Sequence, residues 1–191
     1  TVQKNCGKVV QNFELWGNTN EMFNEQTEFP ASNGKSIKVL IAGNIGASHD
    51  AHIFRKFIEW SVQQEQIELY LSTAQLGYQS HPKIHQLGFI PESQYGSFLS
   101  QMDWALVVQN SKVGVLSLPS RVYNYFASAL PVLAVCGRRS ALWELVNEIE
   151  AGVCFDYEQM EFSDTLVEVL NKISLSANYK KTLRKQYGRF S

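Results

Sequence analysis

Two glycines close behind an apolar run are the first place where this sequence could approach a ligand with its backbone. The run IKVLIA ends at Gly43, and Asn44, Ile45 and Gly46 complete the turn. Glycine lets the backbone turn tightly and come close to a bound group. The spacing is G-x-x-G, and neither a G-x-G-x-x-G fingerprint nor a P-loop is present. The turn therefore fits a ligand loop and an ordinary strand-to-helix connection equally well.

A proline, a serine and an arginine before a helical pattern form the second candidate. Pro119 suits the first helical position, where its missing N–H costs nothing. We expect the N–H groups of Ser120, Arg121 and Val122 to be free there, with the Ser120 hydroxyl and the Arg121 guanidinium beside them. Such a helix start binds anions. The alternative is a plain helix start with Arg121 on the surface.

The segment from Leu87 to Glu92 is the third candidate. Its glycine, aromatic and proline, with Phe89 and Ile90 between them, could form a wall for a planar base. The alternative is a turn that closes one strand before a proline-started helix.

The histidines and cysteines do not form a metal-binding pattern. His81 and His85 flank Pro82, and no cysteine or carboxylate cluster joins His49 and His52 in sequence. The three cysteines are far apart, without zinc spacing, and predict reduced thiols: Cys6, Cys136 and Cys154. We therefore expect no metal. No nucleophile elbow or kinase signature is present either.

Composition excludes disorder and gives no sign of nucleic-acid binding. The chain has 191 residues, 45% of them hydrophobic, with 17 Lys and Arg against 18 Asp and Glu. That is enough apolar material for a core, and a net charge of -1 is not the footprint of a nucleic-acid-binding protein. The basic residues are uneven, because five follow Asn178 with no acid among them: Lys180, Lys181, Arg184, Lys185 and Arg189. This tail suits either a solvated helix face or an anionic membrane surface.

The elements that must position these residues alternate along the chain. Apolar runs predict strands at 37–42, 67–71, 83–87, 104–108, 131–135 and 153–155, with a further short strand near Val9 and Val10. Helical patterns lie at 50–63, from Pro91, at 119–130, 140–147 and 163–173, and in the basic tail, with Ser48 as the expected first N-cap. Alternating strands and helices predict an α/β, Rossmann-like, doubly wound parallel sheet of about six strands. Ligands of such sheets bind beyond the carboxyl ends of the strands.

At this point the sequence resembles a known family. LPSRVYNYFASALPVLA, at 118–134, is similar to the PSK segment of family 4 (group 1) retaining glycosyltransferases with the GT-B fold. Residues 41–46 are similar to their G-N-x-G opening loop and 87–91 to L-G-x-x-P. Residues 102–108 are similar to their A-D-x-x-L-V strand and 144–155 to their E-L-V turn. These segments follow one another in the family's order.

The resemblance implies a division of the chain and a set of site residues. Residues 1–36 would be the lead-in from an absent N-terminal domain, 37–175 the nucleotide-sugar-binding domain (the C-terminal half of a GT-B fold), and 176–191 a basic terminal helix. The implied donor-binding residues are Gly43, Asn44, Gly46, Phe89, Ile90, Pro119, Ser120, Arg121 and Asn124. The catalytic residues would lie mainly on the absent domain.

The sequence departs from the family at several positions. Leu116 and Asn124 stand where many members carry two glutamates, and Asn124 can still hydrogen-bond a ribose hydroxyl. Ala129 replaces the usual glycine before the strand at 131–135. His49 is the nearest polar candidate where many members place a Lys/Arg pair.

The resemblance implies a function as well. The whole enzyme would be a hexosyltransferase that moves a sugar, with retention, from a nucleoside diphosphate to a sugar or lipid-linked saccharide acceptor in surface polysaccharide biosynthesis. It would need no cofactor, would lie in the cytoplasm or peripherally at the inner face of the membrane, and would be inactive as this domain alone. The alternatives are a sugar-nucleotide epimerase of the same fold and a non-catalytic Rossmann-like binding module.

Overall fold

The computed structural model describes residues 36–43, 45, 49–73, 80–88, 90–110, 118–158, 161–174 and 177–187. Its strands are β1 (Ile37–Ala42), β2 (Ile67–Ser72), β3 (Ile84–Gln86), β4 (Trp104–Val108), β5 (Val132–Val135) and β6 (Gly152–Phe155). Its helices are α1 (Ala51–Ser61), α2 (Glu92–Ser100), α3 (Arg121–Ala127), α4 (Ala141–Glu148), α5 (Asp164–Ser174) and α6 (Ala177–Tyr187). The strand expected near Val9 lies outside the described residues.

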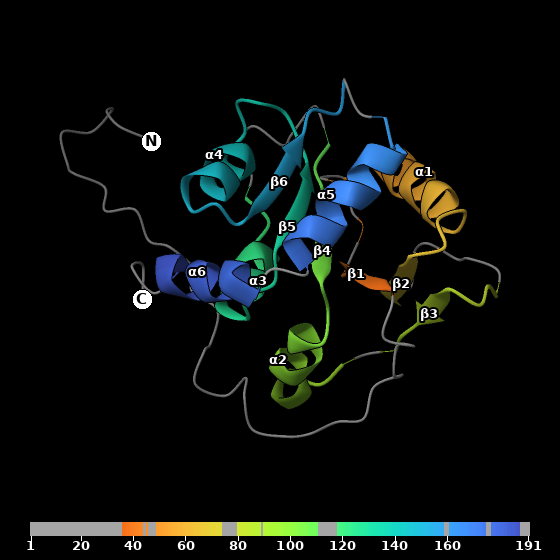
Figure 1. Cartoon of the computed structure of the whole chain (residues 1–191), viewed down its shortest axis with the longest axis horizontal. Helices are drawn as coiled ribbons and strands as arrows, with labels where there is room; N and C mark the ends of the chain where they lie inside the picture. The colour runs from red at the N-terminus through yellow and green to blue at the C-terminus, as the bar shows by residue number, and fades with distance from the viewer. Residues whose placement is uncertain are drawn as a thin grey trace.

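The six strands form one parallel sheet in the order β3-β2-β1-β4-β5-β6 (Figure 1). All five neighbouring pairs are parallel. The prediction of a doubly wound sheet of about six strands is confirmed. The chain moves outward in one direction through β1, β2 and β3, and in the other through β4, β5 and β6. The order therefore reverses between β1 and β4, where folds of this type bind their ligands.

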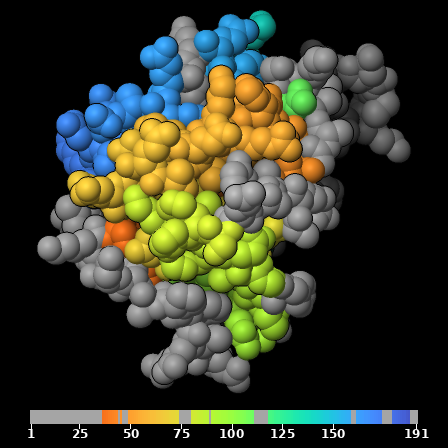
Figure 2. Space-filling model, turned by 90° about the vertical axis from the view of Figure 1, so that its right-hand side faces the viewer, coloured from red at the N-terminus to blue at the C-terminus, as the bar shows by residue number. Residues whose placement is uncertain are grey.

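The sheet is buried on both faces, as its apolar strands require. All five residues of β4 and all four of β5 are buried. Helices α1 and α5 cover one face, and α2, α3, α4 and α6 cover the other (Figure 1). Figure 2 looks at the β3 edge of the sheet and shows α1 lying beside α5 above the segment that carries β3 and α2. Helices on both faces leave the loops at the strand ends as the accessible part of the sheet.

The helix starts follow two different patterns. The carboxylate of Asp50 caps α1, accepting hydrogen bonds from the N–H groups of His52 at 3.0 Å and Ile53 at 3.2 Å. Asp50 is thus the cap itself, so the expectation that Ser48 caps the helix is wrong. The hydroxyl of Ser140 caps α4, accepting from the N–H of Trp143 at 3.1 Å. Helix α3 has no side-chain cap of this kind.

Helix α3 is shorter than its pattern predicted, because the chain turns sharply behind it. Ala129 has a φ of 53°, in the left-handed region that ends a helix. The family resemblance places a glycine at this position, and the backbone shows why a residue without Cβ suits it. The turn sends the chain directly into β5.

Helix α6 carries the basic tail and packs on the domain. It lies against α3 and α5. Leu183 and Tyr187 are buried in the core, while Lys181, Arg184 and Lys185 are exposed. The basic side chains thus occupy the outer face of a helix that is anchored by its apolar face.

Candidate functional site

A cleft of about 700 Å³ opens at the carboxyl ends of the strands, next to the point where the strand order reverses. The ends of β1, β2 and β3 form its floor, and α2 and α3 form its walls. Its lining residues are Ala42, Gly43, Ser72, Thr73, Gln86, Leu87, Gly88, Ile90, Glu92, Tyr95, Arg121 and Asn124. A cavity of this size at this place suits a small organic ligand.

Arg121 reaches across from α3 and covers the glycine at the end of β1. Its guanidinium donates a hydrogen bond to the carbonyl oxygen of Ala42 at 2.5 Å. A Cβ atom on Gly43 would overlap the guanidinium carbon of Arg121. Gly43 has a φ of 94°, so this turn needs a residue without a side chain for its backbone and for the arginine above it. The two residues singled out separately in the sequence are thus in direct contact.

The backbone of the glycine turn is itself partly occupied. The N–H of Gly43 donates to the carbonyl of Ser72 at 2.9 Å and extends the pairing of β1 with β2. That N–H is therefore used by the sheet. Positive charge at this turn comes from the Arg121 side chain, which carries five N–H donors.

The start of α3 differs from the open helix N-terminus expected from the sequence. The N–H of Val122 donates to the carbonyl of Pro119 at 3.1 Å, so the expectation that it is free is wrong. The reason is local, because the chain makes a tight turn at Ser120, whose φ and ψ are already helical. The anionic part of a ligand would therefore depend on the Arg121 side chain more than on this helix end.

The predicted site residues are distributed around the cleft in three ways. Gly43, Ile90, Arg121 and Asn124 line it together. Pro119 lines a small adjoining cavity with His49 and Arg121, and Ser120 is exposed. The other predicted residues, Asn44, Gly46 and Phe89, lie outside the described residues, as does Leu116.

Several cleft residues were not singled out in the sequence. Ser72 is the last residue of β2 and Thr73 follows it, and attention to every strand end would have found them. The side-chain amide of Gln86 donates to the Thr73 carbonyl at 2.9 Å and ties the ends of β2 and β3 together. Tyr95 lies on α2, and no sequence signal places that helix beside α3. Glu92, the first residue of α2, belongs to the segment from Leu87 that the sequence did single out.

Two tyrosines and the arginine form a polar group at the α2–α3 side of the cleft. The hydroxyls of Tyr95 and Tyr125 are hydrogen-bonded to each other. Burial raises the pKa of Tyr125 well above 10, and the neighbouring Tyr95 raises it further. Burial also raises the pKa of Tyr95, while the Arg121 charge acts on both hydroxyls in the opposite direction. Arg121 is therefore near both tyrosines as well as Gly43.

The described residues indicate which chemistry the cleft supports. They hold no group of three His, Cys, Asp or Glu side chains that could bind a metal ion. Among those that line the cleft, Arg121 is the one cation and Glu92 the one carboxylate. An arginine next to neutral hydrogen-bonding groups suits an anionic ligand that also carries hydroxyl or amide groups. None of the described helices is long and apolar enough to span a bilayer.

Solved structures of other proteins share the Rossmann-like fold of this chain. No family model matches the chain, and no curated protein does. The spinosyn rhamnosyltransferase SpnG superimposes with a TM-score of 0.60 at 12% identity, covering 87% of this chain and 45% of SpnG. SpnG complexed with thymidine diphosphate gives 0.58 at 14% identity, covering 86% and 45%. The C-terminal domain of the glycosyl transferase group 1 family protein LpcC from Francisella tularensis gives 0.51 at 14% identity, covering 79% and 82%.

These similarities establish the fold and its extent. The chain has the Rossmann-like fold of a GT-B glycosyltransferase domain, and it covers most of the LpcC domain. It spans less than half the length of SpnG and 42% of the kitacinnamycin glycotransferase. The comparison thus shows a fold that this chain shares with one domain of these proteins.

Proposed function

We propose that this chain is the nucleotide-sugar-binding domain of a glycosyltransferase and that the cleft binds the donor. The observation that carries the proposal is Arg121, which lies over Gly43 beside the switch point of the sheet. A diphosphate is a doubly ionised group whose oxygens suit the planar donors of an arginine. Arg121 would hold these oxygens and stabilise the charge that develops when the sugar leaves.

The remaining cleft residues fit the rest of such a donor. Ile90 and Leu87 offer apolar contacts near the predicted base position, and Asn124 offers an amide to a ribose hydroxyl. Thymidine diphosphate in the SpnG structure supports a nucleoside diphosphate as the ligand class. The donor is thus a substrate, and the proposal needs no metal or other cofactor.

The finer assignment rests on the family resemblance. We infer a retaining transfer to a sugar or lipid-linked saccharide in surface polysaccharide synthesis, with the acceptor held by a second, N-terminal domain. Residues 118–134 support it, since this segment is similar to the PSK segment of the retaining family. On this proposal, this domain and the second domain together would transfer the sugar in the cytoplasm.

An epimerase is less well supported by the cleft. Such an enzyme needs acidic and histidine groups around the sugar. The described residues that line the cleft include one carboxylate, Glu92, and no histidine. Incubation of the donor alone, followed by product analysis, separates the two activities. Only an epimerase converts the sugar without an acceptor.

A thermal-shift screen against UDP-, GDP-, ADP-, TDP- and CMP-linked sugars tests donor binding. At a hundredfold excess over Kd a ligand stabilises the folded state by about 2.7 kcal/mol, which raises the Tm of a chain of this size by roughly 5–10 °C. We expect such a rise with at least one donor, and its loss in Arg121→Ala.

Arg138→Ala is the matched control for that screen, because Arg138 pairs with Asp156 outside the cleft. It should keep the full shift. A wild-type chain that responds to no donor would contradict the proposal and favour a binding module of another kind. An unchanged shift in Arg121→Ala would remove the role given to Arg121.

The basic face of α6 supports a position at the inner face of the membrane. Lys181, Arg184 and Lys185 are spaced three and four residues apart, so they share one exposed helix face. Each basic residue adds about 1 kcal/mol at an anionic lipid surface. Replacing all three with glutamine should therefore weaken binding to phosphatidylserine vesicles by roughly a hundredfold.

The control for vesicle binding removes the same charge elsewhere. Arg55, Lys56 and Lys172 are exposed on α1 and α5, and their replacement with glutamine should leave sedimentation with vesicles nearly unchanged. Equal losses in the two triple variants would show that net charge alone, and not α6, attracts the membrane.

A further inference from the structure

We propose that Tyr95 donates a hydrogen bond from its hydroxyl to a phosphate oxygen of the donor, and that Tyr125 behind it sets the direction of that bond. This inference rests on the proposed function and names a binding residue that the sequence patterns did not indicate. It assigns to α2 a part in holding the diphosphate, opposite Arg121 on α3.

The first step of the argument is the direction of the bond between the two tyrosines. Tyr125 is 1% exposed, and within the described residues its hydroxyl has Tyr95 as its hydrogen-bond partner. A buried O–H that is left without an acceptor costs free energy, whereas the Tyr95 hydroxyl can donate elsewhere. The Tyr125 proton therefore goes to the Tyr95 oxygen, which fills an acceptor position on that oxygen.

The second step concerns the proton that Tyr95 keeps. A tyrosine hydroxyl carries one O–H donor, and Tyr95 is accepting from Tyr125. Its own O–H must then point away from Tyr125. Tyr95 is only partly buried and lines the cleft, so the cleft is where that proton can meet an acceptor.

The third step identifies the kind of acceptor. The Arg121 charge acts on the hydroxyls of both tyrosines, and the same guanidinium covers Gly43. A cation beside a hydroxyl makes the hydroxyl a stronger donor and attracts an anion to the same place. Tyr95 and Arg121 thus present an O–H and several N–H donors toward one region, which suits phosphate oxygens better than a sugar or a base.

Burial keeps this donor in its protonated form. Burial raises the pKa of Tyr95 above 10, so its hydroxyl carries its proton throughout the physiological range. The hydrogen bond is consequently available at every pH at which the enzyme would work, and its strength follows the charge of the phosphate.

The test measures affinity for three ligand classes by calorimetry: the nucleoside diphosphate that the 191-residue chain binds best, its nucleoside, and inorganic pyrophosphate. Tyr95→Phe should lower the affinity for the nucleoside diphosphate and for pyrophosphate by about tenfold, as expected for the loss of one hydrogen bond to a charged group. Its affinity for the nucleoside should stay unchanged. Tyr125→Phe should lower the affinity for the same two ligands by a smaller factor, about threefold, since it removes only the hydrogen bond that orients the Tyr95 hydroxyl.

Tyr179→Phe is the matched control. Its hydroxyl donates to the carbonyl of Glu150 at 2.6 Å, outside the cleft, so this variant loses a hydrogen bond of the same kind and should keep all three affinities. Circular dichroism and thermal unfolding of each variant show whether it is folded.

Each outcome separates this inference from the proposed function. The role given to Tyr95 is wrong if Tyr95→Phe binds the nucleoside diphosphate as tightly as the wild type does, or if its affinity for the nucleoside falls by the same factor. The proposal that the cleft binds the donor would be unaffected. If the wild type binds pyrophosphate but no nucleoside diphosphate, and Tyr95→Phe lowers the affinity for pyrophosphate, the anion site is supported and the assignment of a nucleotide-sugar donor is wrong. If the wild type binds neither ligand, both are overturned.

Discussion

The cleft and the region around α4 each contain a glycine at positive φ, but the atoms that exclude a side chain are different at the two glycines. At Gly43 a Cβ would meet the end of the Arg121 side chain. At Gly152, whose φ is 155°, a Cβ would overlap the carbonyl oxygen of Val132 in the adjacent strand. Gly43 leaves space for a side chain that can move, whereas Gly152 leaves space for a neighbouring backbone that cannot.

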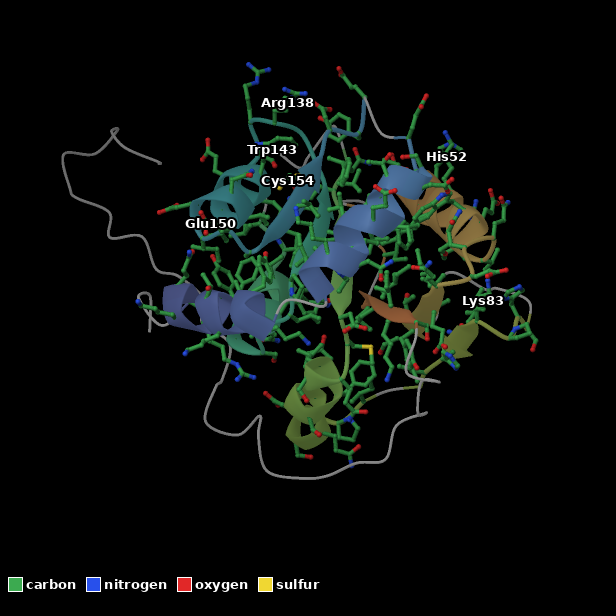
Figure 3. The ribbon with its side chains drawn as sticks, in the orientation of Figure 1. His52, Lys83, Arg138, Trp143, Glu150 and Cys154 are labelled. Atoms are coloured by element: carbon green, nitrogen blue, oxygen red, sulfur yellow. The ribbon has the colours of Figure 1, made fainter. Side chains whose placement is uncertain are left out.

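The serines and arginines of the two regions differ in the same way. Ser140 caps α4, while Ser120 at the corresponding place before α3 forms no such bond. Arg138 pairs with Asp156 at 3.1 Å and lies over the ring of Trp143, whereas Arg121, within the part of the chain that the structure describes, donates to a single backbone carbonyl. Figure 3 shows Arg138, Trp143 and Cys154 gathered around the start of α4.

This contrast explains why one region suits a ligand. Around α4 the polar groups already have partners within the protein, and exchange for a ligand would leave those partners unsatisfied. At the cleft, Arg121 donates to one backbone carbonyl among the described residues, and its remaining N–H groups can meet an anion. Similar residue types thus serve stability around α4, whereas at the cleft they are the residues that we propose for binding.

The largest effect should come from Gly152→Ala. The new Cβ cannot avoid the Val132 carbonyl without separating β5 from β6, so we expect the free energy of unfolding to fall by about 3 kcal/mol. Gly43→Ala should cost less, about 1–2 kcal/mol from the backbone alone, because the guanidinium can move aside. Urea unfolding measures both changes.

The same pair of variants tests whether Arg121 moves. Equal losses of stability in Gly43→Ala and Gly152→Ala would show that Arg121 is as fixed as the strand, and the contrast between the two regions would fail. A larger loss in Gly152→Ala supports it.

A smaller effect is expected at the two serines. Ser140→Ala should lower the free energy of unfolding by about 1 kcal/mol, since it removes the cap of α4. Ser120→Ala should change it by less than about 0.5 kcal/mol, because Ser120 is exposed and caps nothing. Thermal and urea unfolding compare the two variants, and equal losses would mean that α3 and α4 start alike after all.

Much of the fold could be predicted, because its signals are local. The runs from Ile37 and from Trp104 are apolar on both faces, which is typical of parallel strands inside a sheet. Helix boundaries do not follow from such patterns where a single backbone angle decides them, as at Ala129, whose left-handed conformation ends α3 early. The helical pattern at 50–63 takes Asp50 as its first residue, whereas the structure makes it the cap of α1, since both positions favour an acidic residue.

The site could be predicted only in part. Gly43 and Arg121 were found because their motifs carry a physical signal, a flexible turn and a cation at a helix start. Tyr95 was not, since one tyrosine in an amphipathic helix gives no hint that it will meet Tyr125 from another helix.

The sequence by itself determined the elements, their alternation and the end of the sheet at which a ligand would bind, because hydrophobic periodicity and turn residues act over a few positions. Only the tertiary structure decided which side chains meet. Ala42 and Arg121 are 79 positions apart, and the hydrogen bond between them exists because β1 and β4 are neighbours in the sheet and α3 follows β4 along the chain. Contacts of that range depend on how strands and helices pack, which no local pattern encodes.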